Sequence, residues 1–275
     1  MENPQKDTFF RKYKKLLKEE GFFGAFRNTV FQSKVWESVF RHGFSDTPKN
    51  RTLKVISNVF LHLHPAKVKR HAPQFKFTWC MGGISFFLFL TLTVTGILLM
   101  FYYRPTVHDA YWDIKDLEYQ VPFGALLRNL HRWAAHLMVI TVWLHMFRVF
   151  ATGSYKPPRE FNWCVGVVLL VVTLLLSFTG YLLTWDQLGF WAVTVGTNMA
   201  RSTPLLGHEG PFGEQLGMTA HNDIRFALLG GSLVGGNALL RAYVWHCIGL
   251  PLIISVFMMV HFWRIRKDGG ISGPL

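Results

Sequence analysis

Four histidines recur at nearly one spacing and are the residues best placed to do chemistry. His131 and His145 stand at i and i+14. His246 and His261 stand at i and i+15. An α-helical segment of that length rises roughly 21 Å and nearly completes a whole number of turns, so each pair lies on one helix face at two depths. Since imidazole is a common metal ligand, the pairs predict two layers of metal-containing cofactor.

Two pairs of glycines share this spacing. Gly82 and Gly96 stand at i and i+14, and so do Gly166 and Gly180. Glycine alone has no side chain to keep a flat cofactor away from the backbone. Single glycines are frequent in ordinary membrane helix interfaces and indicate little by themselves. Four pairs in four apolar segments together favour a layer of glycine beside each layer of histidine.

The elements that must hold these pairs are long and apolar. Half of the 275 residues are hydrophobic and 16% are charged, against about 25% in soluble domains. Ranges 77–103, 161–185 and 242–263 contain no Lys, Arg, Asp or Glu, and each can cross a hydrocarbon core about 30 Å thick. A fourth apolar segment has arginines near both ends. We expect an all-α membrane protein, a four-transmembrane-helix bundle with helices at about 76–103, 123–150, 161–184 and 241–266.

The positive charge is concentrated before the first helix. Residues 1–78 carry 16 of the 29 Lys and Arg and six acids. The positive-inside rule places both termini and the loop after the second helix in the cytoplasm, as four spans require. We expect residues 1–75 to form an extension of amphipathic helices (7–44 and 50–63) on the cytoplasmic membrane surface. A soluble domain is the alternative. Anionic lipid explains the basic extension more simply than nucleic acid does.

Alternating helix direction decides which histidines meet. The second and fourth helices run parallel, which places His131 with His246 on the outer side and His145 with His261 on the inner side. Two imidazoles suit haem iron and leave no open position for oxygen, which favours electron transfer. Arg132 and Arg148, like Arg128, could pair with haem propionates or anchor the second helix at the membrane interface; the two interpretations stand equal.

These residues strongly resemble the cytochrome b family. The likeness covers about residues 76–275 and is greatest to the short, split form of cytochrome b6-f complexes and bacterial Rieske–cytochrome b complexes. The matching segments are Phe101-Tyr102-Tyr103-Arg104-Pro105-Thr106-Val107, His131-Arg132-Trp133, Lys156-Pro157-Pro158-Arg159-Glu160, Thr179-Gly180-Tyr181, Trp185-Asp186-Gln187 and Gly270-Ile271-Ser272-Gly273-Pro274-Leu275.

The resemblance implies a transmembrane electron-transfer subunit of a quinol:cytochrome c (or plastocyanin-like) oxidoreductase. Electrons from quinol oxidised on the outer side would cross two b haems to an inner quinone site, coupled to proton translocation. His131 and His246 match the outer haem ligands, and His145 and His261 match the inner ones. The implied partners are a C-terminal cytochrome b half (subunit IV-like), a Rieske iron–sulfur protein and a c-type cytochrome, in a homodimeric complex.

The resemblance also bears on Cys80. It precedes Met81-Gly82-Gly83, where the split family carries a cysteine that attaches an additional haem through one thioether. An ordinary buried thiol is the alternative. Arg266 matches a basic residue near that haem and the inner quinone site.

Several departures from the family pattern favour a bacterial complex in the inner (cytoplasmic) membrane. The N-terminal region is long, Thr184 replaces an expected proline, residues 207–222 hold an insertion, and Gly269-Gly270 adds one residue.

Two other functional classes fit parts of the sequence. A di-haem membrane anchor of another quinone-linked dehydrogenase also uses paired histidines. The glycine pairs, the Pro-Pro-Arg-Glu loop and the Trp-Asp-Gln segment favour the quinol oxidoreductase over it. A channel subunit without redox chemistry would leave four membrane histidines unexplained.

Overall fold

The computed structural model describes residues 4–31, 47–59, 62 and 79–268, and all regular structure within them is helical. This confirms the predicted all-α class. The chain forms two compact units, Met1–Val59 and Phe60–Leu275. The second unit begins before the predicted boundary at residue 75, and that boundary stays a prediction.

The first unit contains two helices, α1 (Pro4–Phe31) and α3 (Pro48–Ser57). Gly21 interrupts α1 with a φ of 70°, a left-handed conformation that glycine adopts without steric cost. Phe22, Phe23 and Phe26 are exposed just beyond this break. The predicted helices at 7–44 and 50–63 correspond to α1 and α3, while residues 32–44, 60–61 and 63 lie outside the described residues.

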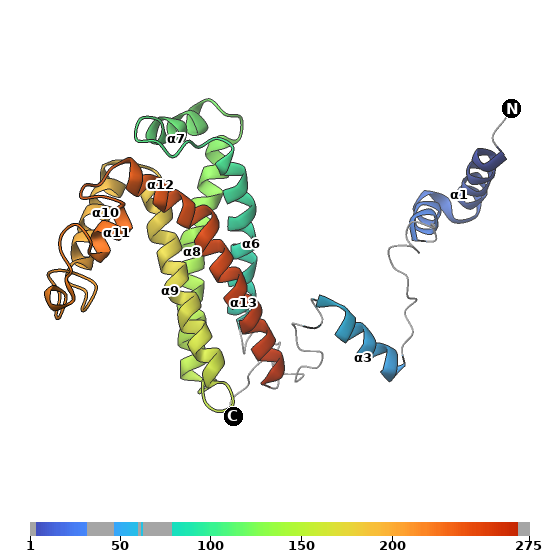
Figure 1. The fold of residues 1–275 in the computed structure, drawn as a ribbon. Coiled ribbons are helices and arrows are strands. Elements are labelled where there is room, and N and C mark those ends of the chain that lie inside the picture. Colours follow the sequence, from blue (N-terminus) through green and yellow to red (C-terminus); the bar gives the residue numbers. More distant parts are fainter. Residues whose placement is uncertain (1–3, 32–46, 60–61, 63–78, 269–275) are drawn as a thin grey trace. The chain divides into compact units, whose positions relative to one another are not determined.

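Among the described residues of the second unit, four helices are long and apolar enough to span a membrane. They are α6 (Met81–Met100), α8 (Gly124–Ala151), α9 (Glu160–Leu182) and the continuous segment Gly236–Lys267, made of α12 (Gly236–Val244), the π turn η2 (Trp245–Gly249) and α13 (Leu250–Lys267). Figure 1 shows α6, α8, α9 and α13 side by side in one bundle. Most of their surface faces outward and is apolar, as with Phe87 and Phe147. The protein is therefore a multi-pass membrane protein.

The largest differences between the observed and the expected helix bounds lie at the starts of the first and fourth spans. Trp79 and Cys80 both have positive φ, 50° and 51°, so α6 begins only at Met81; residues 76–78 of the predicted first helix lie outside the described residues. The fourth span begins at Gly236, five residues before the predicted start at 241. The glycine-rich sequence before this span, which is unusual for a helix, led the prediction to start the helix too late.

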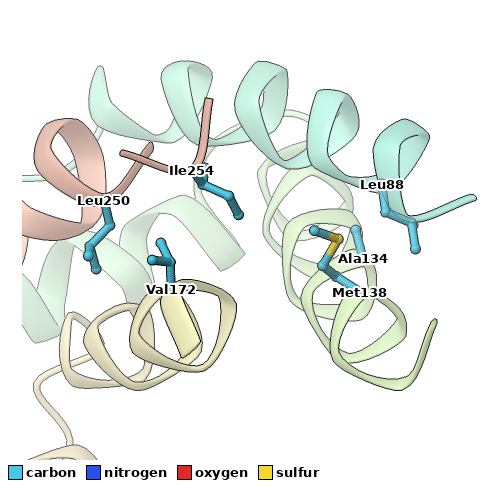
Figure 2. Packing of buried hydrophobic residues seen from close by; sticks show 6 residues of the cluster. All are labelled: Leu88, Ala134, Met138, Val172, Leu250 and Ile254. Atoms are coloured by element: carbon cyan, nitrogen blue, oxygen red, sulfur yellow. The ribbon is translucent and has the colours of Figure 1, made fainter. Parts of the chain in front are cut away.

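An apolar layer lies at the middle of the bundle. Figure 2 shows its buried side chains, contributed by all four spans: Leu88, Ala134, Met138, Val172, Leu250 and Ile254. In sequence, each lies between the two paired glycine or histidine positions of its own helix. A hydrogen bond of 3.0 Å between the Ser85 and Thr141 hydroxyls also joins α6 to α8. The packed layer separates the two levels of histidine.

Two ion pairs hold the connection between α6 and α8 against the bundle end that contains His131. It contains α7 (Ala110–Tyr119), which lies across that end (Figure 1). The Arg104 guanidinium donates to the buried Asp113 carboxylate at 2.6 Å. Arg128 donates to Glu118 at 2.7 Å, which ties α8 to α7. Arg128, one of the arginines that flank the predicted site, is thus engaged in an ion pair.

A tyrosine joins this end to the connection after α9. Tyr103 donates its hydroxyl to the Leu183 carbonyl at 2.7 Å and stacks on Tyr243, with ring centroids 5.7 Å apart. Burial raises the pKa of Tyr103 above its ordinary value, so the phenol stays protonated and keeps this donor.

The connection between α9 and α12 folds into short helices. These are α10 (Gln187–Ala200), the 3-10 turn η1 (Glu214–Leu216) and α11 (Ile224–Leu229). Asp186 caps α10 because its carboxylate accepts a hydrogen bond of 2.8 Å from the backbone amide of Gly189. Asp223 caps α11 in the same way and accepts from the backbone amide of Phe226 at 2.8 Å. Within the predicted insertion, His208 contacts the buried Asp223 carboxylate at 2.6 Å. Side-chain caps thus stabilise the starts of both helices in this segment.

Candidate functional site

The structure brings the four paired histidines together in two layers. The rings of His131 and His246 have centroids 6.3 Å apart with an interplanar angle of 72°. The rings of His145 and His261 have centroids 6.4 Å apart with an angle of 80°. Each layer takes one histidine from α8 and one from the fourth span. Parallel direction of these two helices makes both meetings possible.

These separations fit two imidazoles bound to opposite sides of one metal ion. A metal–imidazole nitrogen bond is roughly 2 Å long, and the ring centre lies roughly 1 Å beyond the nitrogen, so two opposed rings have centroids about 6 Å apart. Each layer supplies two nitrogen ligands. A metal there would take its remaining ligands from a cofactor, as haem iron does from its porphyrin.

The two glycines of α6 face the histidines of α8. A Cβ added to Gly82 would lie 3.3 Å from Cε1 of His145, and one added to Gly96 would lie 3.3 Å from Cε1 of His131. Contacts of this length are tighter than those of most real Cβ atoms. A side chain at either position would therefore crowd the adjacent imidazole, and glycine avoids this crowding.

The two glycines of α9 face the histidines of the fourth span. A Cβ added to Gly180 would lie 2.6 Å from Cε1 of His246. The fit at Gly166 is looser, with Met146 Sδ at 3.6 Å and His261 Cε1 at 4.0 Å. All four paired glycines thus contact one histidine each, and Gly180 has the tightest approach.

Hydrogen bonds orient His131 and His246, called the outer pair after their predicted side; His145 and His261 are called the inner pair in the same way. His131 Nδ1 lies 2.8 Å from the Thr95 hydroxyl, which donates its own hydrogen to the Thr91 carbonyl at 2.7 Å. The hydroxyl therefore accepts from His131. His246 Nδ1 lies 3.1 Å from the Leu176 carbonyl, which can only accept. Both rings carry their proton on Nδ1, which leaves the Nε2 lone pair available to a metal.

The inner pair borders a cavity of about 110 Å³ at the other end of the bundle. His145, His261 and Gly166 line it, together with Arg148 and Arg159. Polar atoms without hydrogen-bond partners are buried there, among them Nε and Nη1 of Arg159. A cofactor with anionic edges, such as a haem with its propionates, would satisfy such groups.

The remaining predicted residues occupy different surroundings. Arg132 is exposed and does not line the cavity. Arg266 donates to the backbone carbonyl of His62. Cys80 is exposed at the start of α6, and its Sγ lies 2.8 Å from where a Cβ on Gly83 would be. His136 is exposed and contacts the edge of Trp133, with centroids 5.7 Å apart.

The π turn explains why the histidines of the fourth span stand at i and i+15. Its Leu250 amide donates to the Trp245 carbonyl, five residues back. A π turn takes up one residue more than an α turn, so the side chains on either side keep the register of an i, i+14 pair. Sequence reasoning missed this turn. The signal was the odd spacing together with Pro251 inside a membrane helix.

The outer-layer threonines were also missed. Thr95 and Thr179 each precede a paired glycine directly. Thr179 Oγ1 lies 3.2 Å from His246 Nδ1. The Thr-Gly dipeptide occurs at the two outer-layer glycines and at neither inner-layer glycine, which was a usable sequence signal.

The fold and this geometry define a class: a multi-pass membrane protein with two layers of paired histidines between its helices. A family model described as Cytochrome b/b6/petB matches residues 67–269. The chain is 43% identical over 203 residues to cytochrome b6 of Auxenochlorella protothecoides and 42% identical to that of Acaryochloris marina. Both alignments cover 74% of this chain and 87% of the relative.

A solved structure described as a hyperthermophilic respiratory Complex III contains a similar chain, with a TM-score of 0.65 and 27% identity over 83% of the present chain. The present chain spans 55% of that chain's length. The protein belongs to the cytochrome b/b6 family. It is a transmembrane electron-transfer subunit of a quinol-oxidising cytochrome complex, in a family that binds b-type haem.

Proposed function

We propose that this chain holds two b haems, one ligated by His131 and His246 and one by His145 and His261. The observation that carries the proposal is the pair of imidazole separations, 6.3 and 6.4 Å, each beside its own glycines. When bound, haem iron accepts and donates single electrons without opening a position to oxygen. The complex would act as a quinol:cytochrome c (or plastocyanin-like) oxidoreductase.

The chain's own residues would orient and insulate these cofactors. Thr95 and the Leu176 carbonyl hold the outer imidazoles with Nε2 toward the metal. The apolar layer of Figure 2 separates the two levels. Arg148 and Arg159 would meet the anionic edge of the inner cofactor. Arg132 and Arg266 remain candidates for propionate or inner quinone contacts.

The direction of transfer follows from the charge distribution. With the basic extension and both termini in the cytoplasm, the His131 level lies on the outer side of a bacterial inner membrane. Quinol would be oxidised there, releasing protons outside, and electrons would move inward to a quinone site. The N-terminal unit would lie on the cytoplasmic membrane surface, where the basic residues of α1 and α3 meet anionic lipid.

A partner chain would complete the quinol site. The chain covers 87% of the length of the cytochrome b6 relative, and by that similarity we propose a separate C-terminal cytochrome b half as a partner, with a Rieske iron–sulfur protein and a c-type cytochrome, in a homodimer. Affinity purification of the tagged chain from its own membranes, followed by subunit identification and a quinol–cytochrome c assay, tests this. A set of dehydrogenase subunits without a Rieske protein would instead indicate a di-haem anchor.

The hydrogen bond from His131 to Thr95 gives a testable effect on redox potential. In Thr95→Val the Nδ1 proton loses its acceptor, the imidazole becomes a weaker donor to the metal, and the oxidised form is less stabilised. Loss of about 1 kcal/mol corresponds to about 40 mV for one electron, so the outer component should shift upward by about that amount. Redox titration of isolated membranes measures the shift.

Thr91→Val is the matched control, because the Thr91 hydroxyl donates only to the Phe87 carbonyl on an exposed face. It should leave both potentials unchanged. An unchanged outer potential in Thr95→Val would contradict the assigned role of Thr95.

Covalent attachment of a further haem through Cys80 is a separate proposal. It is supported by the matching family motif and by the exposed position of the thiol at the end of α6 near the inner layer. A denaturing gel of the chain should then retain peroxidase-active haem, and Cys80→Ala should lose it. Cys164→Ala, which changes another exposed cysteine, should keep it. A haem-free wild-type band would refute the attachment.

A further inference from the structure

The π turn is the one break in otherwise regular α-helix between His246 and His261. Regular helix precedes it over Gly236–Val244 and follows it over Leu250–Lys267. In an unbroken α-helix, an i, i+15 spacing would leave the two histidines about 60° apart, whereas i, i+14 leaves them about 40° apart in the opposite sense. Without the turn, His246 would therefore point about 100° away from the direction that suits the outer layer.

Two residues of the sequence favour a wide turn at this place. Pro251 has no amide hydrogen, and in an α-helix its ring would clash with the Cys247 carbonyl four residues back. A wider turn relieves this clash. Gly249 leaves space that the Trp245 ring occupies, since an added Cβ would lie 2.5 Å from Cε3 of that ring. Both residues thus favour a wide turn at this place.

The result of the turn is visible in the geometry of the site. The outer ring pair has nearly the same separation as the inner pair, 6.3 against 6.4 Å, although the spacing on the fourth span is one residue longer than on α8. His246 also reaches the Leu176 carbonyl at 3.1 Å and fits against Gly180. A helix rotated by about 100° could make none of these contacts.

We propose that the π turn is a one-residue insertion that sets the register of His246, and that Pro251 and Gly249 are positioning residues for this ligand. The π turn accommodates the inserted residue. Deleting one residue of the turn should therefore convert it to regular α-helix and leave the direction of His246 unchanged. This inference rests on the proposed metal-binding role of His246.

Two single-residue deletions test the proposal, both made in the full chain within the native complex. The first carries Pro251→Ala so that a regular helix is permitted, whereas the second keeps Pro251 and Gly249, which hold the turn in place. The first deletes Ile248, inside the turn. The second deletes Val256, in regular helix between the same two histidines. The deleted side chains are matched, since both are branched and aliphatic and they are 50% and 53% exposed.

Deletion of Ile248 should retain both b-haem components in reduced-minus-oxidised spectra of membranes. Deletion of Val256 should lose one of these components. The turn persists in this variant, and the α-helix between the turn and His261 is then one residue too short to keep His246 in register with His261. Equal behaviour of the two deletions, whether both keep or both lose their components, would overturn the proposal. Wild-type membranes report separately on the proposed function: if they lack two components, the ligand assignment itself fails.

Discussion

Replacing His131 with leucine is expected to remove the same spectral component as replacing His246 with leucine, and to leave the other component in place. The reason is the 6.3 Å ring separation, which fits the proposed binding of both imidazoles to one metal ion. Loss of either axial ligand opens the coordination sphere and should eliminate the native component almost completely. His145→Leu and His261→Leu should together define the second component in the same way.

His136→Leu provides the matched control for these four variants. His136 lies on the same helix as His131 but is exposed and packs against Trp133, so both components should survive its loss. If His131→Leu and His246→Leu eliminated different components, the pairing of the helices would be wrong. Spectra of membranes titrated at defined potentials distinguish the two outcomes.

The substitution Gly180→Ala is expected to cause the next largest loss. Its new methyl group would lie 2.6 Å from Cε1 of His246, closer than real Cβ contacts. Displacing a ligand ring in a packed site costs about 1–3 kcal/mol, which should weaken haem retention in the outer layer alone by a factor of about 5 to 150. Haem content after detergent purification, resolved by component, measures this.

Gly166→Ala on the same helix is the comparison. The nearest atoms to its new methyl group are at 3.6 and 4.0 Å, ordinary contact distances, so the inner component should change little. Equal losses at the two glycines would show that close approach to the histidine is not what glycine provides here.

Much of the fold could be predicted because it depends on length and period. The four spans follow from uninterrupted apolar sequence, and the approach of the α8 histidines to those of the fourth span follows from alternating helix direction. The positions of the paired glycines next to histidines follow from their common spacing. In each case the constraint is a length, a direction or a residue spacing, which can be read directly from the sequence.

What could not be predicted depends on contacts between helices. The i, i+15 spacing of His246 and His261 indicates an extra residue, but only the structure shows that the residue is taken up at Trp245–Gly249. The hydrogen bond from Tyr103 to Leu183 joins two segments that are far apart in sequence. Arg128 was one of the arginines considered as partners for haem propionates, and the structure shows it paired with Glu118 instead. The pattern of charges in the sequence could not reveal this ion pair.

The central claim is that one chain holds two non-covalently bound haems at two levels of one helix bundle. The most direct test is to purify the complex, quantify acid-extractable haem per copy of this chain, and titrate its reduction optically. The structure predicts two extractable haems per chain and two one-electron steps, one abolished in His246→Leu and the other in His261→Leu. A single extractable haem, or two haems that both disappear with His261→Leu while His246→Leu has no effect, would contradict the account.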